Sequence, residues 1–147
     1  MISNAQIIIR LLLSVILSGC VGLERQIRGR TAGLRTHILV GLGSSLIMLT
    51  SLYVFDIFEN KVPLDPARLA AGVITGIGFL GAGTILREKT EVRGLTTAAS
   101  LWVVACIGLA LGCGFYIAAV FSTALVLVVL GVLRYLEFKA LGKKAKE

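Results

Sequence analysis

The chain has 147 residues, of which 56% are hydrophobic and 16% charged, and its mean hydropathy is +0.92. A soluble domain carries about 25% charged residues, so this composition excludes an ordinary soluble domain and makes lipid the natural surrounding. The formal net charge of +7 comes mainly from Lys and Arg in short segments between apolar runs. That pattern is typical of membrane topology and not of a nucleic-acid-binding face.

Five apolar runs divide the sequence. They cover residues 5–23, 38–55, 69–86, 95–111 and 115–133. Each run is close to the roughly 20 residues that a helix needs to cross a bilayer. We therefore predict an all-α polytopic membrane protein with about five transmembrane helices. We expect one transmembrane domain over residues 1–138, a short turn between the last two helices, and a basic cytoplasmic tail over residues 139–147.

The positive charges predict the orientation of these helices. Twelve Lys and Arg follow the first, third and fifth runs, whereas only Lys61 and Arg68 lie between the second and third. The positive-inside rule then places the N-terminus outside and the C-terminus in the cytoplasm. The stretch from Leu17 to Cys20 resembles a lipoprotein cleavage site, but cleavage there would put four arginines outside. We therefore predict that the first run is a retained helix.

The third run is rich in glycine. Its glycines are Gly72, Gly76, Gly78, Gly81 and Gly83. Small residues four positions apart let membrane helices approach closely, which predicts a helix-packing face. The alternative is that these glycines expose backbone carbonyls that line a polar path or form a hinge.

Two charged residues lie near the expected outer surface. Arg10 falls inside the first apolar run, where it must either snorkel to the surface or bond to another helix. Asp65 precedes a proline and is suited to capping the third helix. The alternatives for Asp65 are contact with a cation or a partner, with Arg68 as its counter-ion. Because both side chains fall at a similar depth, an Arg10–Asp65 pair is a specific expectation.

Three polar clusters face the expected cytoplasmic side. They are Glu24 with Arg25, Arg35 with Thr36 and His37, and Arg93 with Thr96 and Thr97. Such residues anchor helices at the interface, or they gather into one polar patch below the bundle; the sequence leaves both interpretations open.

The sequence offers little for metal or cofactor chemistry. None of the eight acidic residues falls in the middle of an apolar run, although hard cations prefer carboxylate ligands. The cysteines Cys20, Cys106 and Cys113 form no Cys-x-x-Cys pair. We therefore expect no cofactor, no resident metal site beyond the single candidate ligand Asp65, and no enzymatic activity, since no nucleophile–base set is visible.

Four motifs occur in order along nearly the whole chain. They are RLLL and GLERQ at residues 10–13 and 22–26, GLRTH at 33–37, DPAR with GIGFLGAG at 65–68 and 76–83, and VRGLTTAASLW at 92–102. Together they resemble the MgtC/SapB family. The resemblance maps the family's motif residues onto Arg10, Glu24, Arg25, Arg35, Thr36, His37, Asp65, Arg68, Arg93, Gly94, Thr96 and Thr97.

The resemblance implies a multi-pass protein of the bacterial inner membrane. Members of this family are linked to growth in low magnesium and, in pathogens, to survival inside macrophages. Some are thought to act by binding other membrane proteins, including the ATP synthase. Many members continue into a soluble cytoplasmic domain, which we do not expect here, and Gly72 stands where relatives often carry a polar residue.

Two functions follow as expectations. The first is a protein that modulates other membrane proteins or ion balance under low magnesium or acid stress, with a membrane-protein partner and a homodimer as its expected associations. The alternative is a transporter or channel for magnesium or another ion, with the third helix lining the path.

Overall fold

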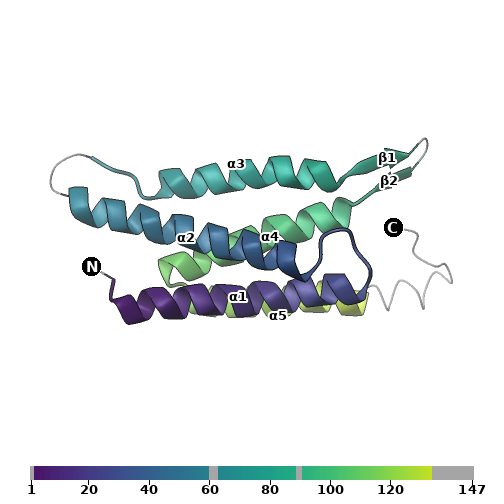
Figure 1. Cartoon of the computed structure of the whole chain (residues 1–147), viewed down its shortest axis with the longest axis horizontal. Helices are drawn as coiled ribbons and strands as arrows, with labels where there is room; N and C mark the ends of the chain where they lie inside the picture. The colour runs from purple at the N-terminus through teal and green to yellow at the C-terminus, as the bar shows by residue number, and fades with distance from the viewer. Residues whose placement is uncertain (1, 60–62, 89–90, 134–147) are drawn as a thin grey trace.

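The computed structural model describes residues 2–59, 63–88 and 91–133. The elements run α1 (Asn4–Ile27), α2 (Leu34–Phe58), α3 (Ala67–Thr84), β1 (Leu86–Glu88), β2 (Glu91–Arg93), α4 (Leu95–Cys113), α5 (Tyr116–Val128) and the π-helix η1 (Val129–Leu133). Figure 1 shows the helices lying roughly side by side along the long axis of the molecule. The predicted all-α class is confirmed, and the tail predicted for residues 139–147 lies outside the described residues.

The helix ends follow from local chemistry. Ser3 and Gln6 form a capping box at the start of α1, in which the backbone N–H of Gln6 donates to Ser3 Oγ at 3.3 Å. Gly114, at φ +88°, ends α4 and turns the chain into α5. A left-handed backbone of this kind suits glycine because it has no Cβ. The short turn predicted between the last two helices is therefore built on this residue.

The third helix is shorter than its apolar run. It ends at Thr84, and the chain then forms an antiparallel two-stranded ribbon in which Leu86 pairs with Arg93. The helix thus ends two residues before the end of the third apolar run, which reaches residue 86. The ribbon leads to Gly94, whose φ of +90° places it at the N-cap of α4.

Helix α4 lies at the centre of the bundle. It contacts α1, α2, α3 and α5, and half of its most apolar stretch is buried inside the molecule. Its buried side chains form the core together with neighbours such as Val21 on α1 and Ala119 on α5. The remaining helices surround α4, so each keeps an outward apolar face.

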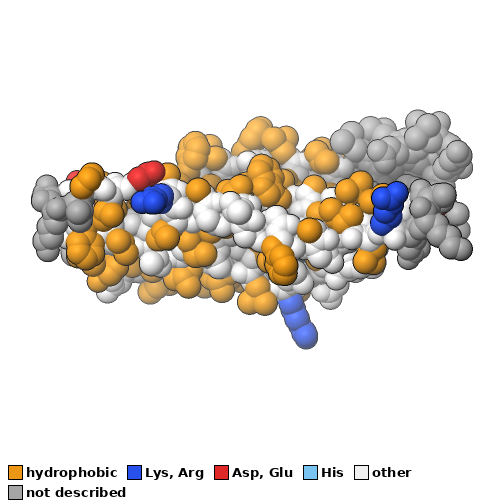
Figure 2. All heavy atoms as spheres, turned by 90° about the horizontal axis from the view of Figure 1, so that it is seen from above, with side chains coloured by type: hydrophobic (Ala, Val, Ile, Leu, Met, Phe, Trp, Pro, Cys, Tyr) orange, Lys and Arg blue, Asp and Glu red, His pale blue; other side chains and the backbone are white. Residues whose placement is uncertain are grey.

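The outward face is the surface expected of a protein in lipid. Large apolar side chains such as Phe79 (84% exposed) and Ile117 (82% exposed) point away from the core. Figure 2 shows hydrophobic side chains spread along the length of the visible face, with charged side chains at only a few places. In the described residues, α1 to α4 are long and apolar enough to cross a membrane, and α5 with η1 forms a shorter apolar helix. The protein is thus a multi-pass membrane protein.

Candidate functional site

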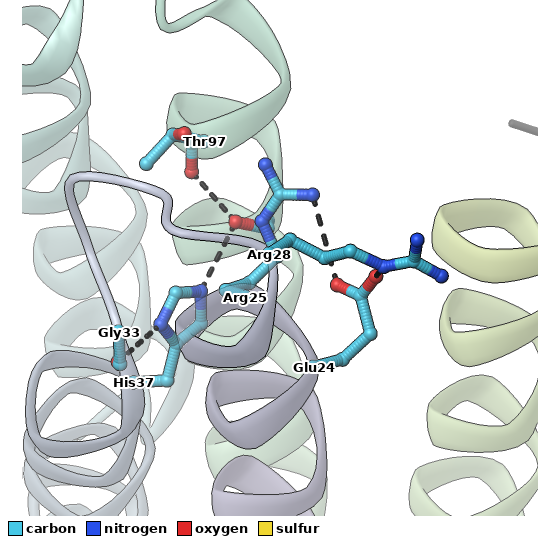
Figure 3. Close-up of polar contacts among 7 residues, drawn as sticks. Glu24, Arg25, Arg28, Gly33, His37 and Thr97 are labelled. Carbon is cyan, nitrogen blue, oxygen red and sulfur yellow. Dashed lines mark hydrogen bonds and ion pairs between the residues drawn. The ribbon is translucent and has the colours of Figure 1, made fainter.

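His37 is the centre of a buried polar cluster at one end of the bundle. Its side chain is completely buried. Nδ1 lies 2.8 Å from the Gly33 carbonyl oxygen, and Nε2 lies 3.0 Å from Ser100 Oγ on α4. The Ser100 hydroxyl is also 2.8 Å from the carbonyl oxygen of Thr97 (Figure 3). These contacts tie the start of α2 to the first turns of α4.

This cluster has two hydrogen-bond arrangements that differ by one proton. A neutral imidazole carries one N–H, so donation from Nδ1 to Gly33 makes Nε2 an acceptor for the Ser100 hydroxyl. An imidazolium donates at both nitrogens, which frees the Ser100 hydroxyl to donate to Thr97. The contacts of His37 with Gly33, of His37 with Ser100 and of Ser100 with Thr97 need three protons if all are hydrogen bonds at once. A neutral imidazole and one hydroxyl supply only two. The position of the ring proton and the protonation state of His37 therefore decide whether the Ser100 hydroxyl donates to Nε2 or to the Thr97 carbonyl oxygen.

The first helix contributes charged groups to the same end. Arg25 is 2% exposed, and its Nη1 lies 3.7 Å from Glu24 Oε2. Arg28 Nε donates to Glu24 Oε1 at 3.3 Å, so one carboxylate serves two arginines. Figure 3 shows these three side chains in the close-up of the His37 cluster. A buried arginine near a carboxylate and an imidazole makes this end of the bundle a charged site within apolar surroundings.

Only part of the predicted cytoplasmic patch is assembled. Glu24, Arg25, His37 and Thr97 come together, whereas Arg35 and Thr36 are exposed on the first turn of α2. Arg93 is also exposed, and its Nη2 lies 3.1 Å from Glu91 in the ribbon. The half-buried Thr96 lies beside Thr97 at the start of α4. Ser100 was missed because a serine in an apolar run gives no signal without its partner histidine.

Arg10 lies on α1, at the opposite end of the bundle from the His37 cluster. It is 8% exposed, its Nη1 donates to the Gly112 carbonyl at 2.7 Å, and its Nε donates to Tyr116 Oη at 3.3 Å. The guanidinium thus binds the carbonyl end of α4, where the helix dipole favours a positive charge. Of the two expectations for Arg10, bonding to another helix describes the structure and snorkelling does not.

The expected Arg10–Asp65 pair is wrong. Asp65 is exposed, and its Oδ1 accepts from the Ala67 backbone amide at 2.8 Å. The N-cap of α3 is Pro66, so Asp65 bonds the first amide of the helix from one position before the N-cap. Arg68 is exposed on the first turn of α3. Figure 1 shows α3 and α1 on opposite sides of the bundle. The two residues share a depth, but α2 and α4 lie between their helices.

Buried serines connect the two ends. Ser14 and Ser18 follow Arg10 at four-residue spacing on α1, and Ser45 lies on α2; all three are completely buried. None of their hydroxyls has a hydrogen-bond partner among the described residues. We call Arg10, Ser14, Ser18, Ser45, His37 and Ser100 the polar seam. The four-residue spacing of Arg10, Ser14 and Ser18 was the sequence signal that could have found it.

Close helix packing occurs along this seam and not on α3. An added Cβ at Gly22 would lie 2.8 Å from His37 Cβ, and one at Gly112 would lie 2.6 Å from Met48 Cβ. Gly41 faces Ser18, and Gly108 faces the Gly41 backbone. These four glycines let α1, α2 and α4 approach closely. The predicted packing residues differ: only Gly81 contacts another helix, at Ala98, while a Cβ at Gly72, Gly76, Gly78 or Gly83 would meet no atom within 4 Å.

The described residues contain no group of three or more His, Cys, Asp or Glu side chains that could hold a metal ion. Asp65, the single candidate ligand, lies alone at the start of α3 with its carboxylate bonded to Ala67. Cys20 and Cys113 are exposed free thiols and Cys106 is partly buried. The arrangement therefore presents hydroxyls, guanidinium groups and one imidazole, which donate and accept hydrogen bonds at both ends of the bundle.

Comparisons with known proteins agree with the motif pattern. A family model described as "MgtC family" matches residues 11–139. The chain is 48% identical over 142 residues to an Escherichia coli protein named "Putative magnesium transporter YhiD", a match that covers 95% of this chain and 66% of that relative. It is 44% identical over 120 residues to "Protein MgtC" of Salmonella typhimurium, covering 82% of this chain and 49% of the relative.

"Protein MgtC" of Brucella abortus is 42% identical over 136 residues, covering 88% of this chain and 54% of the relative. The chain thus spans about half to two thirds of the length of these curated relatives. No solved structure matches it. Because the family model matches most of the chain, from the first helix to beyond the fifth, this protein belongs to the MgtC family.

Proposed function

We propose that this protein acts without catalysis, by associating with another protein of the bacterial inner membrane that serves magnesium homeostasis. The observation that carries the proposal is the packing of α3. This helix contacts α2 and α4 through a single face that contains Val73, Ile77 and Gly81. Only 17% of its most apolar stretch is buried, the lowest share among the four described helices that are long enough to span a membrane, so most of its surface is accessible from the membrane.

The open side of α3 carries small residues at the spacing of a helix–helix contact. Ala71, Thr75, Gly78 and Ala82 follow one another at intervals of four, three and four, and all four are exposed. We call them the outward stripe of α3. Small residues at such intervals let two membrane helices approach closely enough for extensive van der Waals contact. Phe79, beside Gly78, adds a large exposed side chain that can pack against a partner.

The magnesium part of the proposal comes from the relatives. The Escherichia coli relative carries the name "Putative magnesium transporter YhiD", and MgtC gives its name to the family that includes this chain. We extend the resemblance to the physiological setting and propose activity under low magnesium or acid stress. The orientation expected from the positive-inside rule places the His37 cluster on the cytoplasmic side.

The proposal is tested by affinity capture from solubilised membranes. We expect a stoichiometric protein partner with the unmodified chain and its loss with Gly78→Leu, because the larger side chain would hold the two helices apart. Val120→Leu on α5 is the matched control, since it enlarges another exposed position without touching the outward stripe. Recovery of the same partner with Gly78→Leu, or of no partner at all, would contradict the proposal.

The name of the YhiD relative favours a second candidate, transport of magnesium. This candidate requires flux by the protein alone. Magnesium uptake into proteoliposomes that contain only the purified protein, beside an Asp65→Ala variant, separates the two functions. Saturable flux that is lost in the variant would establish transport and place Asp65 in the pathway. Folded protein with no flux would favour association.

A further inference from the structure

An apolar groove runs between α2 and α3. It has a volume of about 850 Å³, and its lining reaches from Thr36 to Thr50 on α2 and from Leu69 to Leu80 on α3. Gly72 and Gly76 leave it open, because an added Cβ at either position would meet no atom within 4 Å. The groove therefore exists because the glycines of α3 face it without filling it.

The groove ends beside a positively charged hollow. Thr36 lines the groove and also a second hollow of about 370 Å³, which is bounded by Gln26, Gly33, Leu34 and Arg35 as well. Arg35 is exposed, and the first turn of α2 contains no acidic residue. In this first turn the Leu34 amide donates to Gln26 Oε1 at 3.1 Å and the His37 amide to the Gly33 carbonyl oxygen at 3.2 Å. The amides of Arg35 and Thr36 remain at the positive end of the helix dipole. An anionic group is the complement of this surface.

The length and volume of the groove indicate what fills it. From Thr36 to Thr50 the helix rises about 21 Å, which exceeds half of the ~30 Å hydrocarbon thickness. An extended acyl chain is thin enough to enter lengthwise, and it reaches the hollow from the lipid leaflet on the same side.

We propose that the groove between α2 and α3 binds one acyl chain of an anionic phospholipid whose phosphate is held by Arg35 and Thr36. This site lies on a different side of α3 from the outward stripe that the proposed partner would use. The acyl chain therefore packs against α3 at the positions where Gly72 and Gly76 have no side chains. The charge of Arg35 favours anionic over neutral phospholipids. The missing side chains of Gly72 and Gly76 leave room for the acyl chain.

The test is native mass spectrometry of the purified full chain in detergent. The probes are phosphatidylglycerol and phosphatidylcholine with identical acyl chains, added separately. One arginine contributes a preference of about fivefold for an anionic surface, so we expect about fivefold higher occupancy by phosphatidylglycerol. Arg35→Ala should remove this preference, and Gly76→Leu should reduce binding of both lipids because its side chain enters the groove.

Two matched variants control the measurement. Arg28→Ala removes the same charge from the same end of the bundle but outside the groove, and Gly78→Leu enlarges the same helix on its outward stripe. Both should bind lipid like the unmodified chain. Thermal unfolding of each variant shows that it is folded. Equal occupancy by the two lipids, equal losses with Arg28→Ala and Arg35→Ala, or unchanged binding with Gly76→Leu would each overturn the proposal. The lipid measurement is independent of the partner-capture experiment. Loss of the partner with Gly78→Leu would therefore not change the lipid occupancy expected here.

Discussion

At the scale of single residues, His37 shows how one polar side chain organises an apolar bundle. It bonds a carbonyl in its own N-terminal turn and a hydroxyl on α4, and it is completely buried. A buried imidazole without partners would destabilise the fold, since burial of an unsatisfied polar group costs free energy. With both partners in place, the same residue connects two helices.

We predict that His37→Ala lowers the free energy of unfolding by about 2 kcal/mol, because it removes an interhelical hydrogen bond and leaves a small cavity. Reversible unfolding in mixed detergent micelles measures the change. Thr50→Ala is the control, since the exposed Thr50 hydroxyl bonds only the Leu46 carbonyl of its own helix at 2.9 Å. If the two variants are equally stable, His37 does not link α2 to α4.

Arg10 allows a second prediction at the residue scale. A double-mutant cycle between Arg10→Ala and Tyr116→Phe should give a coupling energy of about 1 kcal/mol, because the Nε–Oη hydrogen bond is lost in both single variants. The parallel cycle of Arg10→Ala with Asp65→Ala should be additive, since the two side chains lie on helices separated by the bundle. Coupling in the second cycle and not in the first would contradict the structure.

At the scale of helices, α4 and α3 differ most in how they pack against their neighbours. Helix α4 is surrounded and carries glycines at close contacts with α2, whereas α3 packs by one face and four of its five glycines meet no atom within 4 Å. The same residue type therefore has two roles in one chain. Glycine permits close approach where a neighbouring backbone is present, and it leaves an opening where none is.

This contrast predicts opposite responses to the same substitution. Gly108→Ala should lower the free energy of unfolding by about 1–3 kcal/mol, because the added methyl would lie 2.9 Å from Ser44 Cβ and close to the Gly41 carbonyl. Gly78→Ala should leave stability unchanged or slightly raised, since it faces open space and alanine favours helix. Thermal unfolding in detergent compares them, and equal melting temperatures would refute the assignment of close packing.

At the scale of the whole molecule, the arginines and lysines predict a topology. We expect Arg28 in the cytoplasm and Asp65 outside. In a variant with all three cysteines replaced by alanine, a membrane-impermeant maleimide should label Asp65→Cys in intact cells. It should label Arg28→Cys only after the membrane is permeabilised. The reverse pattern would mean that the protein is inserted with the opposite orientation.

Hydrophobicity and helix-end residues carried most of the fold prediction. The five predicted runs fall on α1 to α5 with η1 because apolar length is a property of consecutive residues. The bond from the Ala67 amide to Asp65 and the turn at Gly114 likewise depend on residues close together in the sequence. The motif pattern was sufficient for the family, which the comparison over residues 11–139 confirms.

The sequence by itself thus determined the membrane class, the helices, the family and a set of polar candidates. Only the tertiary structure decided which of these candidates meet. It paired Arg10 with Gly112 and Tyr116 in place of Asp65 and brought Ser100 to His37. It also left Gly72 and Gly76 in the groove between α2 and α3, without a neighbour. The physical reason is that depth and helix face can be read along one chain. Which helices are neighbours depends on the packing of all of them around α4.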